Sequence, residues 1–236
     1  MITQLLRAEW LKIKRKGLWF LALLGPIGVV ALQMVNYGVR KDYLLAQSDD
    51  DWGYYLSNVG GFTPMALILG LVILTSLMAS IENESNGWKQ WIALPISKMS
   101  VYASKFIIVA VLLFVSSCVL TILTLLYGRT LELGENIPWL QLLMNSFYPY
   151  LASLALVGLH LWIAIISQHQ GVTITIGIMG VIICMMSYYL PDWVIWKWPT
   201  LMNDWNNPLI NVALGVGAAI ILLVIGMWDF NRRDVA

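Results

Sequence analysis

The amino-acid sequence predicts an all-α integral membrane protein, and three observations lead to this fold class. Only 11% of the 236 residues are charged and 59% are hydrophobic, whereas soluble domains carry roughly 25% charged residues. Long stretches without Asp, Glu, Lys or Arg cover residues 17–39, 52–81, 106–128, 136–191 and 205–228. Runs such as LILGLVILTSLMA lack the polar and apolar alternation of barrel strands, so we expect lipid-embedded helices.

Six membrane-spanning helices follow from these stretches, because a span needs about 20 apolar residues. The stretch 136–191 is too long for one helix, and its only polar cluster, SQHQG at 167–171, predicts a turn between two spans. The expected spans are residues 18–36, 62–82, 104–127, 142–166, 172–190 and 209–228. We expect one membrane domain, residues 1–236.

The distribution of Lys and Arg predicts that both termini are cytoplasmic. With this orientation, ten basic residues lie in inner segments and four lie in outer loops, and basic residues concentrate on the cytoplasmic side of membrane proteins. No small-residue cleavage site follows Leu24, where the chain continues apolar. We therefore expect the first span to be retained rather than removed as a signal peptide.

Residues 1–16 predict an amphipathic helix before the first span. The apolar side chains that can share one face are Ile2, Leu5, Leu6 and Ile13, with Trp10 at the border. The basic side chains of the other face are Arg7, Lys12, Lys14 and Arg15. One interpretation is an interfacial helix along the inner leaflet that orients the first span; the alternative is a basic topology anchor.

One long polar segment, ENESNGWKQWIALPISKMSVYASK at 82–105, interrupts the first half of the chain. Trp88, Trp91 and Ile92 recur at helical spacing, and Pro95 ends the helix that they predict. This helix either lies on the lipid surface or docks to a protein. A helix, a break and a restart exceed what a simple connection needs, which favours docking.

The segments AEWLKIKRKGLWFLALLGP at 8–26 and ENESNGWKQWIALPISKMSVYASK resemble permease subunits of ABC-2-type exporters. Within these, they are most similar to the small permeases of lantibiotic-immunity and bacitracin-resistance transporters. The resemblance implies an elbow helix at 1–16, six spans, and a coupling helix at 84–96 that enters a cleft of an ATPase subunit. The residues that it assigns to this coupling are Glu82, Glu84, Trp88, Lys89, Trp91, Ile92, Leu94 and Pro95.

ATP hydrolysis is expected on a separate polypeptide, because no G-x-x-x-x-G-K-[ST] motif occurs to hold phosphates. We therefore expect a non-enzymatic chain without a bound cofactor, with ATP and Mg on the partner ATPase. The resemblance implies two ATPase subunits and a second permease, identical or related, in a bacterial cytoplasmic membrane. Membrane lipid is a further expected partner, and nucleic acid is not.

Two outer segments are candidates for contact with a substrate. The connection 191–208 carries four indoles, Trp193, Trp196, Trp198 and Trp205. These are typical of an aromatic belt at the membrane surface, or of a re-entrant segment, as the resemblance suggests. The other outer loop offers a row of three carboxylates, Asp49, Asp50 and Asp51. They would attract a cationic peptide, or they simply keep the loop solvated.

Candidate catalytic and metal-binding residues are scarce. Cys118 and Cys184 lie in mid-span without the spacing of a metal site, so we expect them to pack. His160 is the other ionisable side chain well inside a span, and such residues are candidates for function. No carboxylate accompanies it at helical spacing, so we expect a neutral packing role. We predict no catalytic residue and no metal ligand.

The function that the sequence favours is export of an amphipathic antimicrobial peptide, lantibiotic or bacitracin-like, from the membrane for self-protection or resistance. An ABC-2 permease for another hydrophobic or lipid-linked cargo is the first alternative. A secondary transporter is the second alternative, but the sequence shows neither the matching broken helices nor the ion-coupling charges that such a transporter needs. A membrane subunit without a transport role is the third alternative.

Overall fold

The computed structural model describes residues 2–84, 97–167 and 169–232, and the regular structure in these ranges is helical. A short helix, α1 (Ile2–Lys16), precedes the others. The long helices are α2 (Leu18–Leu45), α3 (Asp51–Glu84), α5 (Lys98–Thr130), α6 (Trp139–Ser167) and α8 (Pro208–Arg232). A shorter helix, α7 (Gln170–Met185), is followed by two 3-10 turns, η1 (Ser187–Tyr189) and η2 (Ile195–Thr200).

Five of the described helices, α2, α3, α5, α6 and α8, are long and apolar enough to cross a membrane. They correspond to five of the predicted spans. The predicted span 172–190 forms α7, which has 16 residues and is about 24 Å long at 1.5 Å per residue. A bilayer core is about 30 Å thick. Leu190 is extended because the residue before a proline disfavours helical geometry, and the chain then turns.

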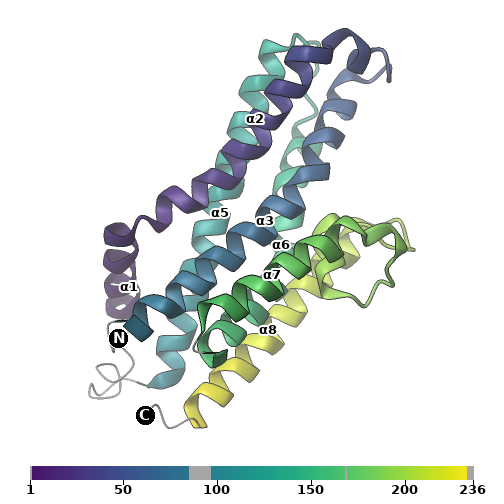
Figure 1. Cartoon of the computed structure of the whole chain (residues 1–236). Helices are drawn as coiled ribbons and strands as arrows, with labels where there is room; N and C mark the ends of the chain where they lie inside the picture. The colour runs from purple at the N-terminus through teal and green to yellow at the C-terminus, as the bar shows by residue number, and fades with distance from the viewer. Residues whose placement is uncertain (1, 85–96, 168, 233–236) are drawn as a thin grey trace.

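Both termini lie at one end of the helical bundle, here called the proximal end, and the opposite end is the distal end (Figure 1). The described ends of α3 and α5 that flank residues 85–96 also lie at the proximal end. At the distal end, α2, α3 and α5 extend beyond α7 and α8. The distal ends of the helices therefore lie at different levels, and the 3-10 turns that follow α7 lie beside the longer helices rather than beyond their ends.

The extension of α3 toward the distal end was not predicted, because the expected span began at residue 62 and the helix begins at Asp51. Aromatic side chains bury the added turns. The Tyr55 hydroxyl donates to the carbonyl of Thr124 at 3.1 Å, and the Trp52 indole donates to that of Gly134 at 3.1 Å. Hydropathy alone misses such a segment, since its polar atoms are paired inside the protein.

Helix α6 is the centre of the bundle and packs against α3, α5, α8 and η2. Its contact with α8 is close, because Gly215 of α8 lies on the backbone of Ala152, and Gly158 of α6 lies on Leu222. Small residues let helix backbones approach one another. Gly217, by contrast, has open space where a Cβ would lie, so only some of the span glycines serve packing.

We expect Gly215→Ala to destabilise the protein by about 1–3 kcal/mol, because its new methyl group overlaps the Ala152 backbone. Gly217→Ala is the matched control on the same helix. It should be neutral or stabilising by up to about 1 kcal/mol, since alanine favours helix over glycine. Thermal unfolding of the purified protein in detergent measures both. Equal stabilisation by the two substitutions would contradict the packing of α6 on α8.

Candidate functional site

Four charged side chains from three helices meet at the proximal end of the bundle. Glu9 and Lys12 come from α1, Glu82 from the last turn of α3, and Lys105 from α5. We call these four residues the proximal charge cluster. The helices α3 and α5 that contribute to it are the two that residues 85–96 connect, so the cluster lies where that segment leaves and rejoins the bundle.

Lys105 is the centre of the proximal charge cluster. Its Nζ donates to Glu82 Oε1 at 2.7 Å and to the two carboxylate oxygens of Glu9 at 3.1 and 3.2 Å. Lys12 Nζ lies 2.6 Å from the same Glu82 oxygen and 3.6 Å from Glu9 Oε1. One carboxylate oxygen of Glu82 thus accepts from two ammonium groups, which joins α1, α3 and α5 directly.

Burial makes these pairings obligatory. The side chains of Lys105 and Glu82 are 0% exposed, that of Glu9 is 1% exposed, and that of Lys12 is 31% exposed. Removing a charge from water costs several kcal/mol unless an opposite charge and hydrogen bonds compensate. Two carboxylates and two ammonium groups balance formally. Each helix therefore depends on the other two to keep its charge buried.

The local sequence explains how α1 reaches the cluster. Glu9 and Lys12 are three residues apart and therefore lie on one face of the helix. Leu5 and Ile13 are buried beside them, and α1 packs mainly against α5. Gly17 has φ +72, a left-handed conformation that glycine adopts without strain, and it turns the chain from α1 into α2. Of the apolar face predicted for residues 1–16, Leu5 and Ile13 thus contact protein.

Of the residues assigned to coupling, Glu82 lies in the proximal charge cluster. Glu84 is exposed and accepts a hydrogen bond from Ser80 Oγ at 2.7 Å. The other six, Trp88, Lys89, Trp91, Ile92, Leu94 and Pro95, lie outside the described residues. Sequence reasoning missed Glu9 and counted Lys105 only as a cytoplasmic basic residue. A signal for Glu9 was present, since it is the sole acid among the basic residues of 1–16.

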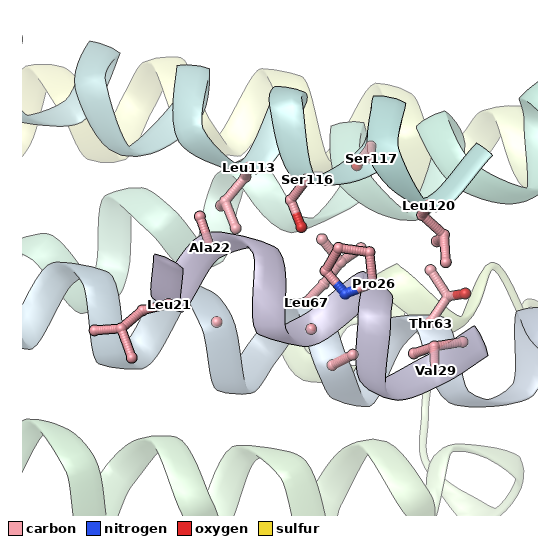
Figure 2. Close-up of a pocket in the computed structure, with 13 residues that line it drawn as sticks. Leu21, Ala22, Pro26, Val29, Thr63, Leu67, Leu113, Ser116, Ser117 and Leu120 are labelled. Atoms are coloured by element: carbon pink, nitrogen blue, oxygen red, sulfur yellow. The ribbon is translucent and has the colours of Figure 1, made fainter. Parts of the chain in front are cut away.

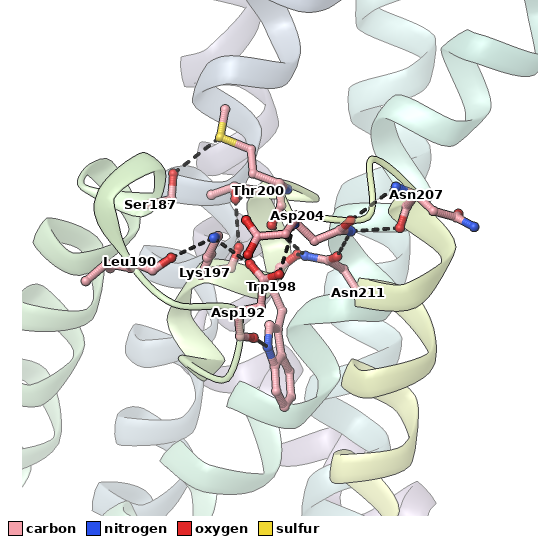
Figure 3. A network of polar contacts seen from close by, with 11 residues as sticks. Ser187, Leu190, Asp192, Lys197, Trp198, Thr200, Asp204, Asn207 and Asn211 are labelled. Carbon is pink, nitrogen blue, oxygen red and sulfur yellow. Dashed lines mark hydrogen bonds and ion pairs between the residues drawn. The ribbon is translucent and has the colours of Figure 1, made fainter.

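At the other end of the membrane helices, residues 190–211 form a folded segment rather than a loose loop (Figure 3). Lys197 Nζ donates to Asp192 Oδ1 and to the carbonyl of Leu190, both at 2.6 Å. The second carboxylate oxygen of Asp192 accepts from the backbone N–H of Asp204 at 2.9 Å. The Asp204 N–H and the Lys197 ammonium lower the pKa of Asp192. Asp192 therefore stays ionised and ties together residues twelve positions apart.

The same segment is fixed to the bundle through α8. Asn211, near the start of α8, donates from its Nδ2 to the carbonyls of Trp198 at 3.2 Å and Met202 at 3.3 Å. Trp198 is buried and donates from its indole to the carbonyl of Asp192 at 2.7 Å. The 3-10 turn η2 is consequently part of the protein core.

The four tryptophans predicted to contact substrate divide into two pairs. Trp198 is buried, and Trp196 is half-buried with its ring 6.5 Å from that of His160. Trp193 and Trp205 are 77% and 62% exposed. This second pair is therefore the more accessible to lipid or to a ligand.

The three carboxylates of the other distal loop have different surroundings. Asp49 and Asp50 are exposed, and Asp51 is half-buried. Asp50 Oδ1 accepts from the Gly53 N–H at 2.9 Å, which is the geometry of an N-terminal helix cap. Asp50 therefore stabilises the start of α3, and this role accounts for one of the three acids without a ligand.

The remaining ionisable candidates lie in the core. His160 is fully buried on α6, and Cys184 is buried in the main hydrophobic cluster. In residues 2–84, 97–167 and 169–232, His, Cys, Asp and Glu form no group of three that could hold a metal ion. Among the described residues, the proximal charge cluster is therefore the strongest candidate for a functional site.

Comparison with known proteins identifies the family. The sequence model of the ABC-2 family transporter proteins matches residues 5–186. The chain belongs to this family. No curated protein matches the chain. Membership makes it a multi-pass membrane permease that associates with an ABC ATPase. The matched range includes the proximal charge cluster. It ends before residues 190–211, the segment that the contacts of Asp192 hold together and that we call the distal segment.

We expect Lys105→Met to destabilise the permease by about 3–5 kcal/mol, because it removes the buried cation that pairs with both Glu9 and Glu82. Thermal unfolding in detergent measures the change. Lys14→Met is the matched control, since Lys14 is an exposed lysine of α1. It should change stability by no more than about 0.5 kcal/mol.

A charge-balanced rescue separates lost pairing from lost packing. Glu9→Gln combined with Lys105→Met removes one charge of each sign and keeps the close pair of Lys12 and Glu82. This double variant should recover part of the stability that Lys105→Met loses. If the double variant were less stable than Lys105→Met, charge balance would not be what the cluster requires.

For the distal segment, we expect Asp192→Asn to lower the unfolding temperature of the permease at pH 7. Because the pKa of Asp192 is lowered in the folded state, its stabilisation is present above the ordinary carboxyl range, about 3.9, and is lost as the pH falls below it. The difference from wild type should therefore shrink on acidification. Asp204→Asn is the control, since Asp204 contributes its backbone N–H. An equal effect of Asp204→Asn would contradict this assignment.

Proposed function

We propose that this chain is the permease subunit of an ATP-driven exporter and that the proximal charge cluster passes the motion of the ATPase to the membrane helices. The observation that carries the proposal is the joining of α1, α3 and α5 through buried ion pairs at the ends of segment 85–96. In this proposal residues 84–96 are the coupling helix, and α1 is the elbow helix.

The cluster suits this role because its parts move together. Separating Lys105 from Glu9 or Glu82 would leave a charge buried without a partner, which is costly. A displacement of segment 85–96 would therefore shift the proximal ends of α3 and α5 jointly, with α1 attached. Closure of an ATPase dimer on binding ATP and Mg would supply that displacement, and hydrolysis would reset it.

The expected six-span topology also belongs to this proposal. Both termini lie at the proximal end (Figure 1), so the chain makes an even number of passages along the bundle. Five helices are long enough to span, and in this proposal the shorter α7 is the sixth span. The excess of Lys and Arg in segments of the proximal end supports a cytoplasmic location for both termini.

The proposed cargo is an amphipathic antimicrobial peptide, lantibiotic or bacitracin-like, taken from the outer leaflet of a bacterial cytoplasmic membrane. The exposed indoles of Trp193 and Trp205 and the exposed carboxylates of Asp49 and Asp50 support it, since they offer aromatic and anionic contacts to a cationic amphiphile. Another hydrophobic or lipid-linked cargo would use the same indoles without the acids. Two ATPase copies and a second permease, identical or related, complete the transporter.

Replacing both Trp88 and Trp91 by Ala tests the coupling assignment. We expect the variant to reach the membrane in near-normal amount, because its spans are unchanged, and to co-purify with less ATPase. Buried aromatic anchors of an interface are worth about 2 kcal/mol or more each. As less ATPase is bound, substrate-stimulated ATP hydrolysis and the protection of cells from peptide should also decrease.

The matched control replaces two exposed distal indoles, Trp193 and Trp205, by Ala. This variant should capture ATPase normally, because its substitutions lie at the opposite end of the bundle, and its protection against peptide should fall if these residues meet the cargo. Unchanged ATPase capture by the Trp88 and Trp91 variant, together with weaker membrane seating, would show that the connection only lies on lipid.

A further inference from the structure

A cavity of about 410 Å³ lies in the distal half of the bundle, between α3, α6, the end of α7 and η2. Its size falls within the range of small-molecule sites, about 300–1,000 Å³. Ser57, Gly60 and Gly61 of α3 line one side, and Asn145 and Pro149 of α6 line another. The residues that line this cavity do not belong to the proximal charge cluster, and membership of the family assigns the cavity no function.

Two helix prolines face this cavity, and each frees a carbonyl group there. Pro64 lies inside α3 and Pro149 inside α6. A proline has no N–H to donate to the carbonyl four residues earlier, and those residues are Gly60 and Asn145. Both also line the cavity. Each of the two helices therefore lacks one helical N–H donor beside the same space, and in a membrane a carbonyl that loses its donor needs another partner.

The side chains around the cavity add both hydrogen-bond acceptors and hydrogen-bond donors. Asn145 uses one N–H of its Nδ2 to donate to the carbonyl of Leu56 at 2.8 Å, which leaves its second N–H and its amide oxygen, and this oxygen lies against Gly60. Thr200 donates its hydroxyl to the carbonyl of Lys197 at 2.7 Å, and Ser187 directs its hydroxyl to Met202 Sδ. The Ser57 hydroxyl at the rim can donate or accept. A ligand that fits must both donate and accept hydrogen bonds, which is what hydroxyl groups do.

The lack of charged lining residues and the apolar surface beside the cavity further restrict the class of ligand that it can bind. Of the described residues that line the cavity, none is Asp, Glu, Lys or Arg. A phosphate or carboxylate would meet carbonyl oxygens without a compensating cation, and an ammonium group would meet no carboxylate. Met185 and Met202 are exposed beside the cavity, and flexible thioether side chains adapt to an alkyl chain.

We propose that this cavity binds an uncharged amphiphile whose headgroup carries several hydroxyl groups, as a sugar headgroup does. The hydroxyl donors bond to the carbonyls of Gly60 and Asn145 and to the Asn145 amide oxygen. The alkyl chain leaves past Met185 and Met202 into lipid. This site is separate from the proximal charge cluster, so binding here does not require that the coupling proposal hold.

A second proline cavity provides the comparison that the test needs. Pro26 of α2 lines a cavity with Ala22, Ser116 and Ser117 (Figure 2). Its volume is about 20 Å³, which holds a single water. The carbonyl of Ala22 is freed by Pro26 just as those of Gly60 and Asn145 are freed. This site offers the same backbone chemistry without room for an amphiphile.

The test is photolabelling of the full chain in phosphatidylcholine nanodiscs. The probe is an alkyl glucoside with a diazirine at the first carbons of its chain, next to the headgroup, and an alkyl phosphate and an alkyl ammonium with the same chain and diazirine are the comparison probes. Peptide mapping should place the glucoside on the segments 57–65, 145–149 and 184–202, which contain the residues that line the cavity. The two charged probes should label these residues less. Equal labelling by all three probes would overturn the proposed headgroup selectivity.

Two kinds of variant test the site itself. Gly61→Leu places a side chain beside the cavity at a position with open space, and Gly28→Leu does the same on α2, away from this cavity. Pro64→Ala and Pro149→Ala each return an N–H to a freed carbonyl, whereas Pro26→Ala does so at the water-sized site.

We expect Gly61→Leu to abolish glucoside labelling and Gly28→Leu to leave it unchanged. Pro64→Ala and Pro149→Ala should each weaken glucoside binding by about three- to tenfold, the loss expected for one hydrogen bond. Pro26→Ala should leave binding unchanged. Loss of labelling in Gly28→Leu or Pro26→Ala to the same extent, or full labelling of Gly61→Leu, would overturn the proposal. ATPase capture should stay normal in all five variants, which separates this outcome from failure of the coupling role.

Discussion

The ammonium group of Lys105 lies 2.7 Å from Glu82 and 3.1 Å from Glu9 in the protein interior, and the proximal end is arranged around this pairing. The three side chains are buried, so their charges need oppositely charged partners within the protein. The position of α1 is fixed by this need, because Glu9 must reach Lys105. The left-handed turn at Gly17 then connects α1, held in that position, to the first span.

A second constraint, close contact between helix backbones, organises the rest of the bundle. Gly215 brings α8 onto Ala152 of α6, and Gly177 brings α7 onto Val72 of α3. Helix α8 also holds η2 through Asn211. The distal segment is therefore built onto α6 and α8, whereas the proximal charge cluster ties together α1, α3 and α5. Helix α3 contacts both groups of helices, since it packs against α6 and α7 as well as α2 and α5.

The sequence predicted most of the helices because each apolar run is long enough to form a span by itself. It failed where the deciding contact is distant in the chain. Lys105 pairs with Glu9 from 96 positions away, and nothing near Lys105 distinguishes a buried lysine from a cytoplasmic one. The prediction missed the early start of α3 for the same reason, since Trp52 donates to the carbonyl of Gly134, which is distant in the chain. The division of the four distal tryptophans depends likewise on which indoles α6 and α8 cover.

The two sites are related through α3, which carries Glu82 at its proximal end and Gly60 and Pro64 in its distal half. A helix is stiff along its hydrogen-bonded turns and bends where a proline removes one of them. A displacement of Glu82 would therefore concentrate its bending near Pro64, where the carbonyl of Gly60 lacks its helical partner. The distance between the freed carbonyls of α3 and α6 would change with it. In the coupling that we propose, an ATPase at the proximal end would thus alter the shape of the distal cavity without touching it.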